Sequence, residues 1–164
     1  MEWYPTKGKT CCFTGHRNIP EKLKADIEQY LENEIERLSE MDFRDFICGG
    51  ALGFDTLAAM AVLKVRNRLP AREIRLHLFL PCHEQTKDWR HEDVYVYDAI
   101  LRRADSVRYI SEAYSSGCMH KRNRYMVDRA SFCIAYCTKK TGGTAYTVKY
   151  AQKSGMEIIN LVYT

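Results

Sequence analysis

The chain has 164 residues, of which 46% are apolar and 28% are charged. This length predicts one domain, residues 1–164, with a buried core, and the composition excludes disorder, collagen and coiled coil. The 25 Lys and Arg against 21 Asp and Glu give a formal net charge of +4. That excess favours anionic ligands but is too small to indicate a nucleic-acid-binding stripe.

Two further features concern the membrane and the cell compartment. The longest apolar run, residues 57–63, is far shorter than the about 20 residues needed to cross a bilayer. The seven cysteines are scattered, with no CxxC pair and no signal peptide before them. We therefore expect a soluble, cytoplasmic protein with reduced thiols and no membrane partner.

Strand and helix patterns alternate along the chain. Residues 10–14 are a short β-prone run, and residues 21–41 carry apolar side chains at helical spacing. Further strands are predicted at 46–48, 74–80, 106–110, 132–136 and 157–162, and further helices at 54–68, 85–103, 118–129 and 144–153. Such alternation predicts a Rossmann-like three-layer α/β/α sandwich with a mostly parallel sheet of about six strands.

In such sheets ligands bind beyond the carboxyl ends of the strands, where loops and helix N-termini converge. Small and polar residues follow the predicted strands directly: Gly15, His16 and Arg17; Gly49, Gly50, Gly53 and Asp55; Pro81; and Gly142, Gly143 and Thr144. Glycines here either bring backbone amides close to a phosphate or only make tight turns, and two such turns favour a phosphate site.

Individual side chains near the strand ends also have either a structural or a ligand-binding role. Asp55 is either a helix N-cap or a contact for ribose or base, and the two roles can coexist. Arg17, Arg122 and Arg124 match phosphate oxygens as bidentate donors, although most arginines are simply solvated, and only Arg17 is favoured by its position directly after a strand. Trp89 and Tyr114 are able to stack on a base, but aromatics at this spacing are more often core residues.

Histidine and cysteine occur together in three loops. These are His16, Cys82 with His83, and Cys118 with His120. Their spacing matches no zinc motif, and a Cys–His nucleophilic pair has no better support. We therefore expect no metal and no resident cofactor.

Several motifs together resemble a known family. They are TGHR at 14–17, GGALGFD at 49–55, Pro81 with Gln85 and Trp89, Tyr114, RNRYMVD at 122–128, and GGT at 142–144 followed by TVKYA. This order of motifs resembles the YpsA/YoqJ-like proteins of the SLOG superfamily, and the resemblance runs from about Cys12 to the C-terminus.

The resemblance implies a Rossmann-like domain that binds a nucleotide or nucleotide derivative at the sheet edge. The superfamily also holds SMF/DprA DNA-processing proteins and LOG-type phosphoribohydrolases, and this bacterial branch is associated with prophages. Its motifs place ligand-site candidates at Gly15, Arg17, Gly49, Gly50, Gly53, Asp55, Arg122, Asn123, Gly142, Gly143 and Thr144, and we add His16, Pro81, Gln85 and Trp89. Related proteins often pair, so a homodimer remains an open alternative.

One departure from the LOG pattern bears on catalysis. LOG-type enzymes carry PGGxGTxxE, whose glutamate serves N-glycosidic cleavage, whereas this chain reads TGGTAYTVKYA with no acid before Glu157. The leading hypothesis is thus a nucleotide-binding or nucleotide-sensing protein without chemistry of its own. The alternatives are a phosphoribohydrolase in which Asp55 or Asp128 replaces the glutamate, and a DNA-associated or protein-interaction module.

Overall fold

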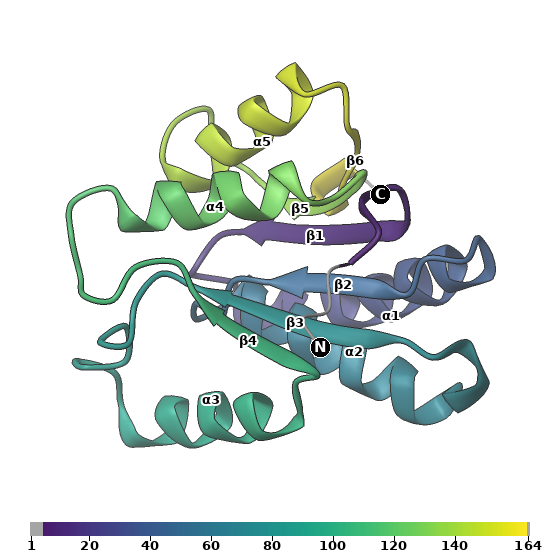
Figure 1. Ribbon diagram of the computed structural model, residues 1–164, viewed down its shortest axis with the longest axis horizontal. Helices are drawn as coiled ribbons and strands as arrows, with labels where there is room; N and C mark the ends of the chain where they lie inside the picture. The colour runs from purple at the N-terminus through teal and green to yellow at the C-terminus, as the bar shows by residue number, and fades with distance from the viewer. Residues whose placement is uncertain (1–4, 164) are drawn as a thin grey trace.

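A single parallel sheet organises the chain (Figure 1). The computed structural model describes residues 5–163, and its six strands lie in the order β4-β3-β2-β1-β5-β6. Every neighbouring pair is parallel. The strands are β1 Thr10–Gly15, β2 Asp45–Cys48, β3 Arg75–Leu80, β4 Ser106–Tyr109, β5 Phe132–Tyr136 and β6 Glu157–Asn160. The predicted Rossmann-like α/β fold is confirmed.

Helices cover both faces of this sheet (Figure 1). The α-helices are α1 Lys24–Glu40, α2 Phe54–Arg68, α3 His91–Arg103, α4 Cys118–Asp128 and α5 Gly143–Lys153, and η2 Glu21–Leu23 is a 3-10 turn before α1. The first three helices pack in one hydrophobic core and the last two in another. Apolar strands buried on both sides are the expected result of this layering.

Strand β1 lies at the centre and reverses the order of the sheet. The chain builds β2, β3 and β4 on one side of it, and β5 and β6 on the other. At the carboxyl ends, Gly15 of β1 is in register with Tyr136 of β5. The crevice above these two strand ends is the topological switch point, where ligands of doubly wound sheets bind.

Two predicted elements differ from the structure at their ends. The helix predicted over 85–103 begins only at His91. The preceding segment instead makes turns closed by hydrogen bonds between residues three apart: the Lys87 amide donates to Glu84 O at 3.1 Å, and the Trp89 amide donates to Thr86 O at 3.0 Å. The strand predicted to reach residue 162 ends at Asn160, whose side-chain oxygen accepts from the Val162 amide and begins a 3-10 turn. The remaining elements lie where predicted, with small shifts at their ends.

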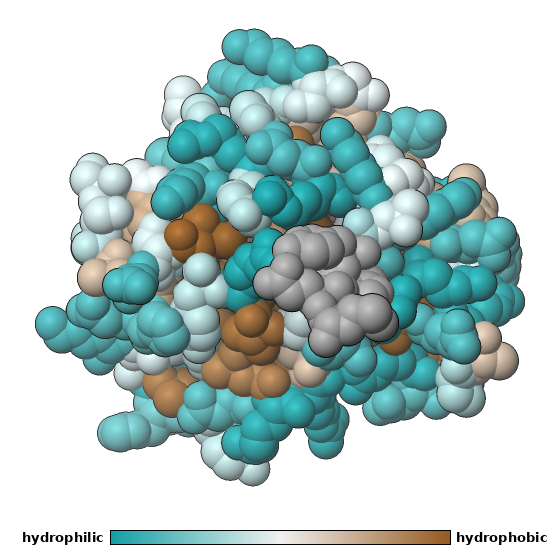
Figure 2. All heavy atoms as spheres, viewed as in Figure 1, coloured by the Kyte–Doolittle hydropathy of each residue, from teal (hydrophilic) through white to brown (hydrophobic). Residues whose placement is uncertain are grey.

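One face of the molecule is mostly polar. Figure 2 shows mostly hydrophilic side chains on one face, with hydrophobic side chains confined to a few small areas. Within residues 5–163 there is no helix long and apolar enough to cross a membrane.

Candidate functional site

Two glycines bring the loop after β1 against the start of α2. A Cβ on Gly15 would overlap the ring of Phe54, and a Cβ on Gly53 would overlap the carbonyl of Arg17. Gly53 also has a φ of +79°, which side chains rarely allow. The Phe54 amide then donates to His16 O at 3.1 Å, so the two loops are joined by a backbone hydrogen bond.

Arg17 is the side chain that this junction presents to the carboxyl edge of the sheet. It lines three cavities, of about 510, 340 and 340 Å³. Its guanidinium carbon lies 5.8 Å from the centre of the Trp89 ring, a cation–π distance. Among the residues that the structure describes, no carboxylate lies within ion-pair distance of Arg17. An exposed, unpaired guanidinium beside an aromatic ring is well suited to an anionic, planar ligand.

The turn before α3 forms the wall of the largest of these cavities. Trp89 packs edge-on against Tyr97, with ring centres 5.3 Å apart, and Gln85 donates to Gly50 O at 3.2 Å. Burial raises the pKa of Tyr97 to about 12, so this phenol stays neutral. The Gln85 Oε1 atom is buried and has no partner within the described part of the chain. The late start of α3 is what places Gln85 and Trp89 beside Arg17 rather than on a helix.

Asp55 and Arg122 form a buried charged cluster below the Gly49-Gly50 turn. They are 7% and 4% exposed. Arg122 donates to the carbonyls of Gly49 and Phe79, and the Asp55 carboxylate accepts from the Ala51 amide at 3.2 Å. Both side chains therefore hold the turn, and α2 has Gly53, not Asp55, as its N-cap.

Burial determines how the same two groups titrate. Loss of hydration raises the pKa of Asp55, while the Arg122 charge and the Ala51 amide act in the opposite direction. Loss of hydration also lowers the pKa of Arg122, partly offset by Asp55. For both groups, loss of hydration is the largest influence on the pKa, and the charge of the partner acts against it.

His16 closes the edge between β1 and β5. Its Nε2 accepts a hydrogen bond from the Thr138 amide at 2.8 Å, which requires the neutral tautomer. Burial, and then the nearby Lys139 charge, lower the pKa of His16 and favour the same neutral form. Together with Arg17, these residues line one of the two 340 Å³ cavities.

The two glycine turns differ in what surrounds them. At Gly49 a Cβ would lie 2.5 Å from Arg122 Nη1, and at Gly50 it would overlap Leu80. At Gly142 and Gly143, in contrast, nothing lies within 4 Å of that position among the described residues, and both glycines are exposed. The first turn is thus filled by protein atoms, whereas the second leaves its amides, at the N-terminus of α5, open to a ligand.

The remaining predicted site residues, Pro81, Asn123 and Asp128, do not lie together. Pro81 is buried, and its carbonyl accepts from Ser111 N at 3.0 Å. Asn123 accepts from Arg122 Nε at 2.8 Å, on the same helix. Asp128 ends α4 just before β5 begins, at the opposite edge of the sheet, and accepts from the Tyr150 hydroxyl at 2.7 Å.

Sequence reasoning did not single out several residues that line the cavities around Arg17: Asn18, Lys24, Thr138, Lys139 and Met119. Only the fold brings them there, although Asn18 follows the TGHR motif directly. Within residues 5–163 no group of three or more His, Cys, Asp or Glu is placed to hold a metal ion.

This arrangement defines the class of protein: a Rossmann-like α/β protein with polar cavities at its topological switch point. A family model described as the YspA SLOG family (YpsA) matches residues 12–161. The chain therefore belongs to the YpsA family of SLOG proteins.

Two curated relatives agree with this assignment. The chain is 29% identical over 148 residues to the SPbeta prophage-derived protein YoqJ of Bacillus subtilis strain 168, which covers 83% of this chain and 81% of YoqJ. It is 28% identical over 132 residues to a UPF0398 protein of Bacillus cereus strain G9842, covering 79% and 71% of the two chains.

Solved structures share the fold. DNA processing protein A (DprA) from Streptococcus pneumoniae superposes with a TM-score of 0.64 at 15% identity, over 94% of this chain and 49% of DprA. DprA from Helicobacter pylori, a structure described for its single-stranded DNA binding mode, superposes with a TM-score of 0.63 at 17% identity, over 93% of this chain and 64% of DprA. The protein TM1055 superposes with a TM-score of 0.59 at 15% identity, over 92% of this chain and 72% of TM1055. The chain thus spans about half to two-thirds of the DprA proteins.

Proposed function

We propose that the chain binds a nucleotide or nucleotide derivative at the carboxyl edge of its sheet. The observation that carries this proposal is the position of Arg17, which is unpaired within residues 5–163 and lines three cavities at the switch point. Family membership supports the same reading. A phosphate needs a guanidinium and open backbone amides, and a base needs an aromatic wall; this edge offers both.

The parts of such a ligand have natural places at this edge. The amides of exposed Gly143 and half-buried Thr144 begin α5 and suit a phosphate, with Arg17 as its cationic donor. Trp89 and Tyr114 both line the 510 Å³ cavity and provide aromatic surface for a base. Asp55 and Arg122 would act as positioning residues, because they are buried and hold the Gly49-Gly50 turn.

We further propose binding or sensing, rather than hydrolysis, as the activity. The sequence of α5, GTAYTVKYAQK, contains no carboxylate, and Asp55 is buried and bonded to a backbone amide. The acids that line the largest cavity, Glu84 and Asp88, are exposed to water. A general acid for N-glycosidic cleavage must reach the leaving base with its carboxyl group, whereas the Asp55 carboxylate is engaged with the Ala51 amide below the Gly49-Gly50 turn.

A thermal-shift panel tests the proposal. Nucleoside mono-, di- and triphosphates, ADP-ribose and cyclic dinucleotides are each added to the protein, and the ligand is analysed by chromatography after incubation. We expect one nucleotide class to raise the midpoint of unfolding and to be recovered unchanged. Arg17→Ala should abolish the shift, whereas Arg102→Ala, which removes an exposed arginine at the end of α3, should not.

Other outcomes would identify other functions. Release of free base, lost in Asp55→Asn, would indicate a phosphoribohydrolase. Binding of a single-stranded oligonucleotide with an affinity that falls steeply with salt would indicate a DNA-associated module, since H. pylori DprA has a single-stranded DNA binding mode. If no nucleotide stabilises the fold, or if Arg17→Ala behaves like Arg102→Ala, the proposed site is wrong.

A further inference from the structure

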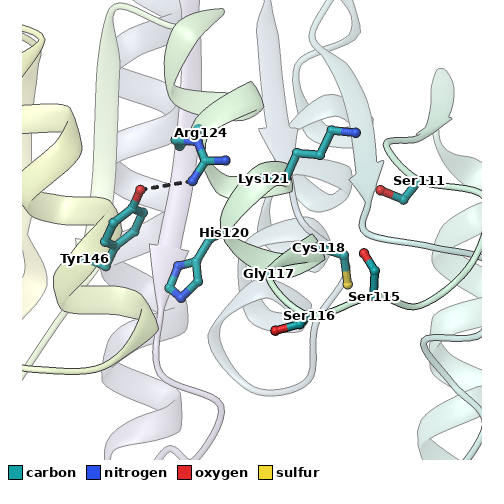
Figure 3. A pocket seen from close by; sticks show the side chains of 9 residues that line it. All are labelled: Ser111, Ser115, Ser116, Gly117, Cys118, His120, Lys121, Arg124 and Tyr146. Carbon is teal, nitrogen blue, oxygen red and sulfur yellow. Dashed lines mark hydrogen bonds between the residues drawn. The ribbon is translucent and has the colours of Figure 1, made fainter.

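A separate cavity of about 420 Å³ lies between the loop after β4, the first turns of α4 and the start of α5 (Figure 3). Its lining residues are rich in hydroxyl and basic groups: Ser111, Ser115, Ser116, Gly117, Cys118, His120, Lys121, Arg124 and Tyr146. We call it the α4–α5 pocket. The segment from Tyr114 to Met119 separates it from the cavity of Arg17, since residues of that segment line both.

The α4–α5 pocket has the more cationic lining of the two. Lys121 and Arg124 contribute positive charge, and none of the nine lining residues is acidic. In the larger cavity, by contrast, Glu84 and Asp88 offset Arg17 and Lys87. Within residues 5–163 neither Lys121 nor Arg124 lies at ion-pair distance from a carboxylate.

The position of Lys121 along the helix is electrostatically unfavourable. Lys121 follows Gly117, the N-cap of α4, by one turn, and the first turn contains no acidic residue. The amino end of a helix carries a partial positive charge, so cations there are repelled and anions are attracted. A bound anion would relieve this repulsion and also accept hydrogen bonds from the side chains.

One wall of the α4–α5 pocket is held by contacts to Tyr146. The His120 imidazole packs edge-on against Tyr146, with ring centres 4.4 Å apart, and Arg124 donates to the Tyr146 hydroxyl at 3.0 Å (Figure 3). The His120 Nδ1 atom is inaccessible to water, so a ligand in the pocket does not reach it in this arrangement. Tyr146 therefore fixes the Arg124 guanidinium beside the pocket.

We propose that the α4–α5 pocket binds a phosphoryl group. Lys121 and Arg124 would neutralise its charge, and the serine hydroxyls would donate hydrogen bonds to its oxygens. The group belongs either to free phosphate or to a second phosphate of the nucleotide proposed above. The pocket does not need the nucleotide in order to bind phosphate, so its test is independent of the proposed function.

Isothermal titration with inorganic phosphate, in a phosphate-free buffer, tests this assignment. We expect saturable binding that weakens at least about tenfold in Lys121→Gln and in Arg124→Gln, the loss expected for one charge-assisted contact. Lys153→Gln makes the same charge change in the last turn of α5 and should leave the affinity unaltered.

Adenosine, AMP and adenosine 3′,5′-bisphosphate distinguish the source of the phosphoryl group. If only the bisphosphate loses affinity in Lys121→Gln, the pocket holds a second phosphate of a nucleotide; if none does while inorganic phosphate does, it holds free phosphate. Absence of phosphate binding to the wild type would overturn the proposal. So would a Lys121→Gln variant that binds as Lys153→Gln does, or a loss of phosphate binding in Arg17→Ala alone.

Discussion

Glycines at the carboxyl edge have two different physical roles. Gly53 allows two loops to touch, since any Cβ there would overlap a backbone carbonyl, and its φ of +79° disfavours side chains as well. Gly143 has open space around the position of a Cβ and begins a helix. A glycine of the first kind serves the fold, whereas one of the second kind leaves amides accessible.

Alanine substitutions should separate these roles. We expect Gly53→Ala to destabilise the fold by more than about 2 kcal/mol, because it adds backbone strain to the overlap. Gly143→Ala should leave the unfolding midpoint unchanged or slightly higher, since alanine favours the helix. The same methyl group would crowd the amides of α5 and remove the nucleotide-induced thermal shift. Equal destabilisation by both substitutions, measured in urea, would contradict this distinction.

Asp55 should give the fold a measurable pH dependence. Its pKa is raised by burial, so above the ordinary carboxyl value of about 3.9 the unfolded state ionises more readily than the folded state. The stability of the wild type relative to Asp55→Asn should therefore fall as pH rises from about 3.9 toward the raised pKa. Urea unfolding of both proteins across this range measures the difference.

A matched variant controls for the general effect of acid on the fold. Asp98→Asn removes an exposed carboxylate from α3, and its unfolding over the same pH range measures the effect of the same charge change at the surface. If the difference for Asp55→Asn were constant, or grew with pH, burial would not be the dominant influence on this carboxyl group.

At the scale of elements, local patterns predicted most of the fold. Runs such as residues 132–136 are apolar throughout because both faces of the strand are buried, and the helical spacing in residues 21–41 marks the face of α1 that packs. The start of α3 was not predictable in this way. The local sequence of residues 85–90 is compatible with a helix. In the structure this segment forms turns instead, and Trp89 packs against Tyr97 and Arg17, which are distant in the local pattern.

The candidate site was predictable as a set of loops but not in its interior. Glycines and arginines after strand ends must lie at one edge of a parallel sheet, so Arg17 and Gly143 were identifiable. Whether an arginine faces solvent or the core depends on contacts distant in sequence. Arg122 is buried because it donates to Gly49, which lies 73 residues away. The α4–α5 pocket was not predictable from the sequence for the same reason, because its lining residues come from three separate segments.

The strands also determine the chemistry of the thiols. All seven cysteines are buried, and burial raises the pKa of Cys11 and of Cys48 well above the ordinary thiol value. Because the thiolate is the reactive form, we expect Ellman's reagent to label the native protein slowly and to label seven thiols once guanidinium chloride unfolds it. Rapid labelling of any thiol in the native state would show that a strand or loop opens readily.

At the scale of the whole molecule, the two hydrophobic cores share the central strand. Cys11 and Phe13 of β1 face the core of α1, α2 and α3, whereas Cys12 between them faces the core of α4 and α5. The candidate ligand cavities lie where the loops of both layers meet. Unfolding of either layer would expose one face of β1, so the two layers should lose structure together.

Large-to-small substitutions in each layer test this cooperativity. Leu31→Ala in α1 and Met126→Ala in α4 both remove buried side chains, and each should lower the free energy of unfolding by about 2–5 kcal/mol. In both variants, far-UV circular dichroism and tryptophan fluorescence should follow one transition with the same midpoint. Two separate transitions in Met126→Ala would mean that α4 and α5 unfold independently, and that a phosphoryl group bound in the α4–α5 pocket would stabilise only that layer.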